Sequence, residues 1–346
     1  MIKVVIVDDS AVVRKILKRV LEEDGEIKVV GSAPDPYVAR DMIVKEKPDV
    51  ITLDIEMPRM DGLTFLAKLM RHFPMPVIII SSLTRNSRDM AIKAMELGAV
   101  DVISKPGSSF SVGDVAEEIV EKIKAASRAI IKKKTLSESS GKKKIEPIKI
   151  DTTSKIVAIG ASTGGTEAIK EVLENLPSNF PGVLVAQHMP PGFTQSFAER
   201  LDELCNMHVK EAEEGEPVSV GKVLIAPGNY HLLLKRSGAR YSVRLNQGPR
   251  VHYQRPSCDV LFKSVASEAG KNSIGVILTG MGADGAAGLK MMHESGAYTI
   301  GQDEKSSVVY GMPKAAYDMG AVNKQFPLKQ ISRALINVVS KQEYYF

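Results

Sequence analysis

The sequence lacks most of the features that mark secreted, membrane and metal-cluster proteins. It contains no tryptophan and only two cysteines, Cys205 and Cys258, which lie far apart and fit no metal-binding or redox spacing. No apolar run approaches the roughly 18 residues that a membrane-spanning helix needs. The opening residues lack the basic, apolar and small order of a signal peptide, and the second half shows no helix-turn-helix pattern. These absences predict a cytoplasmic protein that is not embedded in a membrane and does not bind nucleic acid.

The bulk composition is that of an ordinary globular protein, with 44% hydrophobic and 25% charged residues. A chain of 346 residues is expected to hold two domains. The net charge is +5, and part of the excess lies in the run "IKKKTLSESSGKKKIEP", whose composition predicts a solvated linker. We therefore expect a first domain over residues 1–122, a linker over 123–153 and a second domain over 154–346.

Short apolar strands alternate with amphipathic helical stretches five times in the first third of the chain. The stretches "IKVVIV", "DVITLD" and "VIIIS" are almost continuously apolar, which is typical of strands that are buried on both faces. Five strand–helix units predict an α/β domain with a five-stranded parallel sheet of the flavodoxin-like type, covered by helices.

The second half of the chain repeats this alternation. The stretches "KIVAIG", "GVLVAQH", "KVLIAPG" and "SIGVILTG" are predicted as buried strands. A further stretch, "YHLLLKRSGARYSVRLN", predicts a β-hairpin that turns at Ser237–Gly238. We expect a larger, doubly wound α/β domain with this hairpin added to it.

Polar side chains end the predicted strands of the first domain, at the edge where ligands collect in open parallel sheets. These strand ends carry Asp8, Asp9, Asp54, Ser81 and Lys105. Crowded carboxylates repel one another unless a cation joins them, and oxygen ligands of this kind suit Mg²⁺. A carboxylate can also attack phosphorus to form an aspartyl phosphate, whose oxygens a lysine and a hydroxyl would stabilise. The plainer alternative is that the aspartates cap helices.

The stretch "GASTG", Gly160 to Gly164, lies between a predicted strand and a predicted helix and matches the G-x-S-x-G nucleophile elbow. Glycines permit the sharp turn that exposes the Ser162 hydroxyl, and the N-terminus of the next helix favours developing oxyanion charge. A phosphate-binding loop or a plain turn is the alternative, although the Walker lysine and the G-x-G-x-x-G spacing are both missing.

A serine nucleophile needs a base and a group that orients the base. His188 ends the strand "GVLVAQH" and is expected at the same sheet edge as Ser162. Asp284 lies in the glycine-rich loop of "SIGVILTGMGADGAAG", where a helix cap is its alternative role. The other histidines of the second half are weaker candidates. The chain order Ser, His, Asp differs from that of the α/β-hydrolases.

Over residues 1–122 the motifs "VDDS", "DIEMPRMDG" and "ISKP" resemble the receiver domain of two-component response regulators. The resemblance implies that Asp54 accepts a phosphoryl group from a chemotaxis histidine kinase. It further implies that Asp9, Asp54 and the carbonyl of Glu56 bind Mg²⁺, and that Ser81 is the switch hydroxyl.

A receiver, a linker and the motifs "IGASTGG", "QHMPPGFT", "APG" and "LTGMGADGAAG" together resemble the chemotaxis protein-glutamate methylesterase (CheB) family over nearly the whole chain. The resemblance implies that Ser162 attacks, that His188 serves as base and then acid, and that Asp284 orients the imidazole. It also points to the backbone N–H of Met281 as an oxyanion donor. The N–H of Thr163, next to the nucleophile, is a second candidate.

The resemblance implies phosphorylation-regulated hydrolysis of glutamate methyl esters, and deamidation of certain glutamines, on the cytoplasmic helices of methylated chemoreceptors. Mg²⁺ is expected in the receiver only, and the ester step is expected to need no cofactor. The alternative is a response regulator whose second half is a non-catalytic binding module, whereas a DNA-binding output is disfavoured.

Overall fold

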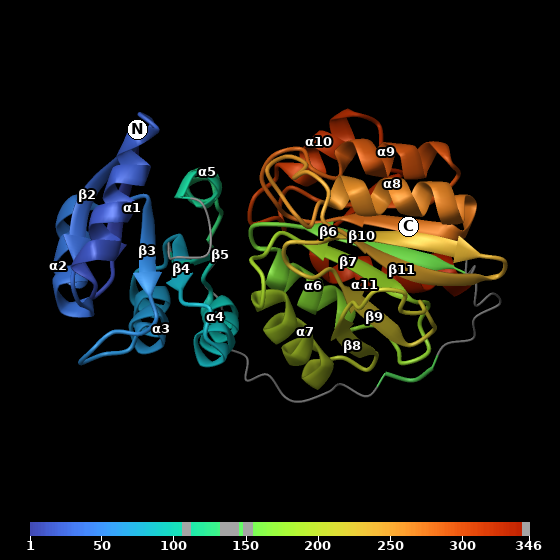
Figure 1. Ribbon diagram of the computed structural model, residues 1–346, viewed down its shortest axis with the longest axis horizontal. Coiled ribbons are helices and arrows are strands. Elements are labelled where there is room, and N and C mark those ends of the chain that lie inside the picture. Colours follow the sequence, from blue (N-terminus) through green and yellow to red (C-terminus); the bar gives the residue numbers. More distant parts are fainter. Residues whose placement is uncertain (106–111, 132–144, 148–154, 341–346) are drawn as a thin grey trace. The chain divides into compact units, whose positions relative to one another are not determined.

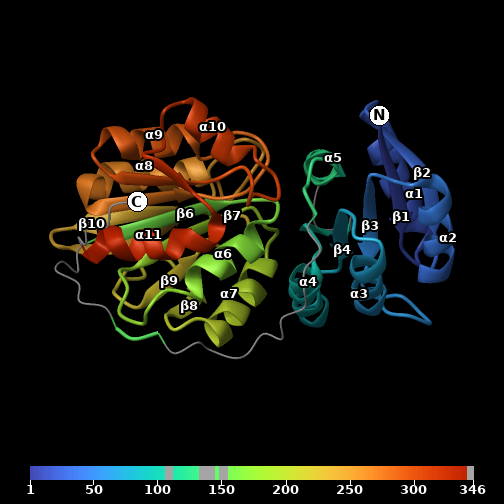
Figure 2. The ribbon, with the colours of Figure 1, turned by 180° about the vertical axis from the view of Figure 1, so that it is seen from behind.

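The computed structural model describes residues 1–105, 112–131, 145–147 and 155–340. The chain divides into two compact α/β units, Met1–Ser137 and Glu138–Phe346 (Figures 1 and 2). Most of the predicted linker lies outside the described residues. Within the described residues, no helix combines the length and apolar character needed to cross a membrane.

The first unit contains the predicted five-stranded parallel sheet, in the flavodoxin-like order β2-β1-β3-β4-β5. Its strands are β1 (Ile2–Val7), β2 (Ile27–Ala33), β3 (Val50–Asp54), β4 (Val77–Ser81) and β5 (Asp101–Ser104). Its helices are α1 (Ala11–Glu23), α2 (Pro36–Glu46), α3 (Gly62–His72), α4 (Arg85–Leu97) and α5 (Val112–Ser127). Because the sheet is parallel, the carboxyl ends of β1, β3, β4 and β5 lie together at one edge.

Local signals explain where the helices of this unit begin. Ser10 caps α1, Asp35 caps α2 and Asp61 caps α3, each by accepting a backbone N–H of the first turn. These N–H groups have no partner within the helix, so the caps satisfy donors that would otherwise be open. None of these three caps is an aspartate that ends β1 or β3, so those aspartates are available for another role.

Helix α5 runs past residue 122, where the sequence predicted the first domain to end. Ile123 and Ala126 are buried in this unit. Lys122 is 5% exposed, and its Nζ lies 2.8 Å from Asp101 Oδ1 and donates to the Val102 carbonyl at 2.7 Å. The last turns of α5 therefore belong to the core of the first unit, because they bury an apolar face and contribute Lys122 to a buried ion pair that joins α5 to β5.

The second unit contains a seven-stranded parallel sheet in the order β14-β13-β12-β6-β7-β9-β8. Its strands are β6 (Ile156–Ala161), β7 (Val183–Gln187), β8 (His208–Glu211), β9 (Lys222–Ile225), β12 (Ser273–Ile277), β13 (Tyr298–Gln302) and β14 (Lys324–Phe326). The chain leaves β6 toward β7 on one side and returns to β12 on the other. This is the switch point of a doubly wound sheet, where a crevice opens at the carboxyl ends of the strands.

Helices cover both faces of this sheet. They are α6 (Gly165–Leu173), α7 (Phe193–Leu204), α8 (Cys258–Ala269), α9 (Ala286–Glu294), α10 (Met312–Asp318) and α11 (Leu328–Ser340), with the short 3₁₀ helix η1 (Gly270–Asn272) after α8. Helices α8, α9 and α10 pack together on one face, and α6 and α11 pack on the other (Figures 1 and 2).

Three strands of this sheet, β8, β13 and β14, were not predicted from the sequence. β8 forms one edge of the sheet and β14 the other, and β13 lies between β14 and β12. β8 and β14 have only four and three residues. Strands this short carry too little periodicity to be recognised without their neighbours.

The predicted hairpin is present as β10 (His231–Ser237) and β11 (Arg240–Asn246). The turn residues are Gly238 and Ala239, one position later than predicted, and Gly238 has a φ of +60°. One face of the hairpin is buried against α8 in the core of the unit. This packing connects the hairpin to the helix whose N-terminus lies in the site described below.

We expect Lys122→Ala to lower the free energy of unfolding of the receiver unit by about 3–5 kcal/mol, because it removes the ammonium that faces the buried Asp101 carboxylate. Calorimetric unfolding of the full chain measures the effect. Lys18→Ala, at an exposed position of α1, is the control and should change the value by less than about 0.5 kcal/mol. Equal effects of the two substitutions would contradict this role of the ion pair.

Candidate active site and receiver pocket

The receiver pocket lies at the carboxyl edge of the first sheet. Asp8 and Asp54 are each 1% exposed, and Lys105 Nζ lies 3.4 Å from Asp8 Oδ2 and 2.7 Å from Asp54 Oδ2. The exposed Asp9 joins the two buried aspartates in a group whose carboxylate oxygens lie within 4.8 Å of one another. These four pocket residues are therefore neighbours, although they follow three different strands.

The electrostatics of the pocket fit a divalent cation. Burial raises the pKa of Asp54 to about 6, even though the hydrogen bond and charge of Lys105 act in the opposite direction. Burial also raises the pKa of Asp8, whose buried Oδ2 is left without a hydrogen bond in the described part of the chain. A hard cation bound by carboxylate oxygens would offset both effects, and this donor set suits Mg²⁺.

Ser81 and Glu56 are both tied to the first turn of α4. The Ser81 hydroxyl donates to the Ser87 carbonyl at 3.1 Å, and the Glu56 carboxylate accepts the Ser87 hydroxyl at 2.6 Å. The Glu56 N–H donates to Asp54 Oδ1 at 3.1 Å, which places this peptide at the pocket. The roles of Ser81 toward a phosphoryl group and of the Glu56 carbonyl toward Mg²⁺ stay predictions.

The Ser162 turn joins β6 to α6 at the switch point of the second sheet. The Ser162 N–H donates to the carbonyl of Thr279, which follows β12, at 3.0 Å. Gly164 has a φ of +76°, and a Cβ at Gly280 would lie 2.7 Å from Ser162 Cβ, so glycine is required at both positions. Helix α6 begins at Gly165 without a side-chain cap, and the Gly165 N–H donates to the Ser162 carbonyl at 2.6 Å, which closes the turn.

His188 lies between Ser162 and Asp284. Its Nδ1 is 3.1 Å from Ser162 Oγ, and its Nε2 is 2.7 Å from Asp284 Oδ2. Since an ionised carboxylate only accepts hydrogen bonds, Nε2 carries the ring proton and Nδ1 is the acceptor that faces the serine hydroxyl. All three side chains are at most 9% exposed. Three segments that are far apart in the sequence thus bring a hydroxyl, an imidazole and a carboxylate into line, the arrangement that a nucleophile, a base and an orienting group require.

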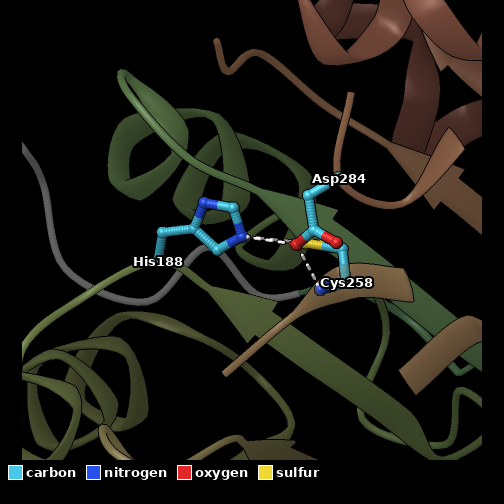
Figure 3. A group of neighbouring side chains, drawn as sticks. All are labelled: His188, Cys258 and Asp284. Atoms are coloured by element: carbon cyan, nitrogen blue, oxygen red, sulfur yellow. Dashed lines mark hydrogen bonds and ion pairs between the residues drawn. The ribbon is translucent and has the colours of Figure 1, made fainter. Parts of the chain in front are cut away.

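The N-terminus of α8 holds the Asp284 carboxylate. The Ser257 hydroxyl and the Asp259 N–H donate to Oδ1 at 2.7 and 3.1 Å, and the Cys258 N–H donates to Oδ2 at 2.7 Å. Figure 3 shows Asp284 between the His188 ring and the Cys258 amide. Burial acts to raise the pKa of Asp284, but the hydrogen bonds from His188, Ser257 and Cys258 lower it to about 2. The carboxylate is therefore a fixed anion at a helix N-terminus.

The thiol of Cys258 gives this cluster the donor set of a zinc site. Ligand atoms of His188, Cys258 and Asp284 lie within 4.8 Å of one another. The Asp284 carboxylate, however, already accepts four hydrogen bonds, which is its full capacity. Burial also raises the pKa of the Cys258 thiol well above its usual value. Both observations favour an orienting carboxylate over a metal ligand.

The two predicted oxyanion donors flank Ser162 on well-held peptides. The carbonyl of Thr163 accepts the Thr279 hydroxyl at 3.0 Å. Met281 follows Gly280, whose carbonyl accepts two N–H groups from the start of α10. These contacts hold both segments beside the serine, and donation by the two N–H groups to a reacting oxygen stays a prediction.

The groups that hold Asp284 were missed by the sequence analysis. Ser257 is the N-cap of α8, and a serine before an apolar helical stretch is the signal that could have found it. Behind it, His231 Nδ1 accepts the Ser257 N–H at 3.2 Å, and His231 Nε2 donates to the Pro249 carbonyl at 2.9 Å. Burial lowers the pKa of His231, so this second buried histidine is a neutral support and not a base for Ser162.

We expect the second unit to lose part of its stability between about pH 4 and pH 2 because of Asp284. The pKa of this group is about 2 in the folded chain against an ordinary value of 3.8, so the ionised form stabilises the fold above pH 3.8. This contribution, at most about 2 kcal/mol, is lost as the pH falls through the folded pKa.

Equilibrium unfolding at several pH values measures this dependence. Asp284→Asn should reduce the slope of the free energy of unfolding against pH in this window. Asp318→Asn, at an exposed position of α10, should leave that slope unchanged. The same slope in wild type and Asp284→Asn would contradict the anchored carboxylate.

Comparison with known proteins agrees with this architecture. The family described as CheB methylesterase matches residues 157–335, and the family described as response regulator receiver domain matches residues 4–115. A protein of Syntrophus aciditrophicus, named protein-glutamate methylesterase/protein-glutamine glutaminase 2, is 59% identical and aligns over 98% of this chain and 99% of its own. A protein-glutamate methylesterase/protein-glutamine glutaminase of Pectobacterium atrosepticum is 52% identical over 98% of this chain and 97% of its own.

A solved structure resembles the second unit. The crystal structure of the Thermotoga maritima CheB methylesterase catalytic domain is 41% identical in sequence, with a TM-score of 0.53, and covers 54% of this chain and 99% of that one. Together with the family matches and the full-length relatives, this shows that the chain belongs to the CheB methylesterase family and carries a response regulator receiver domain.

Proposed function

We propose that this chain hydrolyses glutamate methyl esters in proteins to glutamate and methanol, and that it deamidates certain glutamines. The observation that carries the proposal is the hydrogen-bonded line from Ser162 Oγ through the His188 ring to Asp284. The names of the full-length relatives support the substrate class. A non-catalytic output module, the alternative from the sequence, has no use for this arrangement.

Attack by Ser162 begins the proposed reaction. His188 Nδ1 takes the hydroxyl proton as Oγ bonds to the ester carbonyl carbon, and Asp284 stabilises the imidazolium that forms. The tetrahedral intermediate then collapses. Its C–O bond to the methoxy group breaks, and His188 returns the proton so that methanol leaves. Water, deprotonated by the same nitrogen, attacks the acyl-enzyme and releases glutamate with Ser162 restored. For a glutamine, the C–N bond breaks and ammonia leaves in place of methanol.

Backbone N–H groups would stabilise the oxyanion of both tetrahedral intermediates. We assign this role to Met281 and Thr163, because their peptides are held against Ser162 by the contacts of Gly280 and Thr279. The ester step needs no cofactor in this scheme, since the proton, the nucleophile and the oxyanion donors all come from the chain.

We further propose that Asp54 is phosphorylated by a chemotaxis histidine kinase and that this raises the rate of the second unit. An Asp54 oxygen would attack the phosphorus of a phosphohistidine, and the P–N bond would break. Lys105, 2.7 Å from Asp54, is placed to stabilise the phosphoryl oxygens. Asp9, Asp54 and the Glu56 carbonyl would hold Mg²⁺, which supplies positive charge to the transferring group when bound.

The proposed substrates are methylated helices of chemoreceptors, and the proposed compartment is the cytoplasm. Cys205 and Cys258 are both buried and form no disulfide with a described residue, which is consistent with a reducing compartment. We place the catalytic domain at residues 154–346 and the receiver at 1–122, the latter extended by the end of α5.

We expect Ser162→Ala to reduce methanol release from methylated chemoreceptor fragments by at least about 10³-fold, because it removes the hydroxyl that forms the acyl-enzyme. Gas-phase or enzymatic detection of methanol measures the rate. Ser219→Ala, at an exposed loop position, is the control and should match the wild type. Residual activity of Ser162→Ala above a few per cent would exclude the proposed nucleophile.

We expect a small phosphodonor with Mg²⁺ to raise methanol release by the wild-type chain and to have no effect on Asp54→Asn, since the amide cannot accept the phosphoryl group. Removing Mg²⁺ with a chelator should abolish the stimulation as well. Asp41→Asn, at an exposed position of α2, should respond like the wild type. Stimulation that persists in Asp54→Asn would place the phosphorylation site elsewhere.

A further inference from the structure

A long segment beside the active site contains no acidic residue. Between Glu216 and Asp259 the chain runs for 42 residues without an aspartate or a glutamate, where its average composition would place about five. The same segment holds seven basic residues, Lys222, Lys235, Arg236, Arg240, Arg244, Arg250 and Arg255. It forms β9, the β10–β11 hairpin and the loop that leads into α8. Charge of one sign concentrated in this way creates a local positive potential.

None of the five arginines of this segment makes an ion pair with a carboxylate in the described part of the chain, but Arg236 and Arg255 donate instead to carbonyl and amide oxygens. Lys222 and Lys235 form ion pairs with glutamates from outside the segment, at 3.1 and 3.5 Å. By contrast, Arg240, Arg244 and Arg250 are exposed and make no ion pair with any described residue. Their charges therefore remain available to a partner molecule.

Two of the three arginines share the outer face of the hairpin. Arg240 and Arg244 alternate along β11 with Tyr241 and Val243, which are buried in the core. Four residues of strand separate them by about 13 Å. The seven paired positions of the hairpin span about 20 Å, which matches about 13 residues of an α-helix laid along it.

The third arginine lies at a rigid turn between the hairpin and α8. Val251 and Gln254 pair with each other, and the two residues between them, His252 and Tyr253, have φ values of 50° and 61°. Arg250 donates to the Tyr253 carbonyl at 3.2 Å. Residues other than glycine rarely adopt positive φ values. In this turn the Tyr253 side chain is 64% exposed.

Residues of the hairpin and of the turn contact the start of α8, which holds Asp284. His231, the first residue of β10, accepts the Ser257 N–H, and the Ser257 hydroxyl donates to Asp284. His252 Nε2 lies 3.5 Å from the carboxylate of Asp259, in the first turn of α8. The hairpin and the turn are thus both joined, through these contacts, to the start of α8, whose N-terminus holds Asp284.

We propose that Arg240, Arg244, Arg250 and Tyr253, here called the basic face, dock an acidic helical segment of the protein substrate, the segment that carries the glutamyl ester. The proposal rests on the proposed function. Each hydrolysis converts a neutral ester into a carboxylate, so the partner gains negative charge where the enzyme carries unpaired positive charge. The arginines bind its acidic side chains, and the Tyr253 ring packs on it close to the triad.

The test compares the full-length wild type with the double variant Arg244→Glu/Arg250→Glu on two substrates. One is a methylated chemoreceptor fragment, and the other is a short uncharged peptide that contains one glutamate γ-methyl ester. For the fragment we expect KM to rise about tenfold with kcat retained, and the salt dependence of KM to weaken. For the peptide we expect no change. Lys329→Glu, an exposed reversal on α11 in the layer on the other face of the sheet, should behave as wild type on both.

The outcomes separate this proposal from the function on which it rests. An unchanged KM of the double variant for the fragment would overturn the basic face and leave the esterase intact. An equal loss on fragment and peptide would also overturn it, because the arginines would then act on the triad and not on docking. A wild type that hydrolyses neither substrate would overturn the proposed function and the docking surface together.

Discussion

The second unit depends on one buried anion, the Asp284 carboxylate at the N-terminus of α8. Four donors surround it, and three of them come from Ser257, Cys258 and Asp259 at the start of this helix. An anion in this position complements the helix dipole and fills the open N–H groups of the first turn. The fourth donor is His188, so the same interaction fixes the ring proton on Nε2 and leaves Nδ1 for Ser162. Asp284 in effect caps α8 rather than α9, the helix that follows it in the chain.

The two sites of the chain contain aspartates whose pKa values are shifted in opposite directions. Donors lower the pKa of Asp284 to about 2, whereas burial raises that of Asp54 to about 6. Asp284 is stabilised as an anion and orients its partner without changing. The negative charge of Asp54 is only partly offset by Lys105, because burial and the neighbouring Asp8 act against it. Its pKa is therefore sensitive to a charged group that binds there. The surroundings of two aspartates therefore shift the pKa of the same kind of side chain in opposite directions.

Both sites lie at the carboxyl edge of a parallel sheet, but different elements complete them. In the receiver, Asp8 and Asp9 after β1, Asp54 at the end of β3 and Lys105 directly after β5 supply the pocket. In the second unit, the Ser162 turn, the loop after β7 and the loop after β12 meet at the switch point of the sheet. Helix α8 then connects this point to the hairpin, so one helix both holds Asp284 and supports the buried face of β10.

The sequence by itself determined the α/β class, most central strands and the candidates Ser162, His188 and Asp284. These follow from local signals, because buried parallel strands are continuously apolar and their ends carry the polar side chains. Only the tertiary structure decided which donors hold Asp284 and which histidine nitrogen faces the serine. Ser257 lies 27 positions before Asp284, and no local pattern joins them. The tertiary structure also decided the edge strands β8 and β14 and the last turns of α5. These segments are stabilised by neighbouring elements, so their own periodicity does not reveal them.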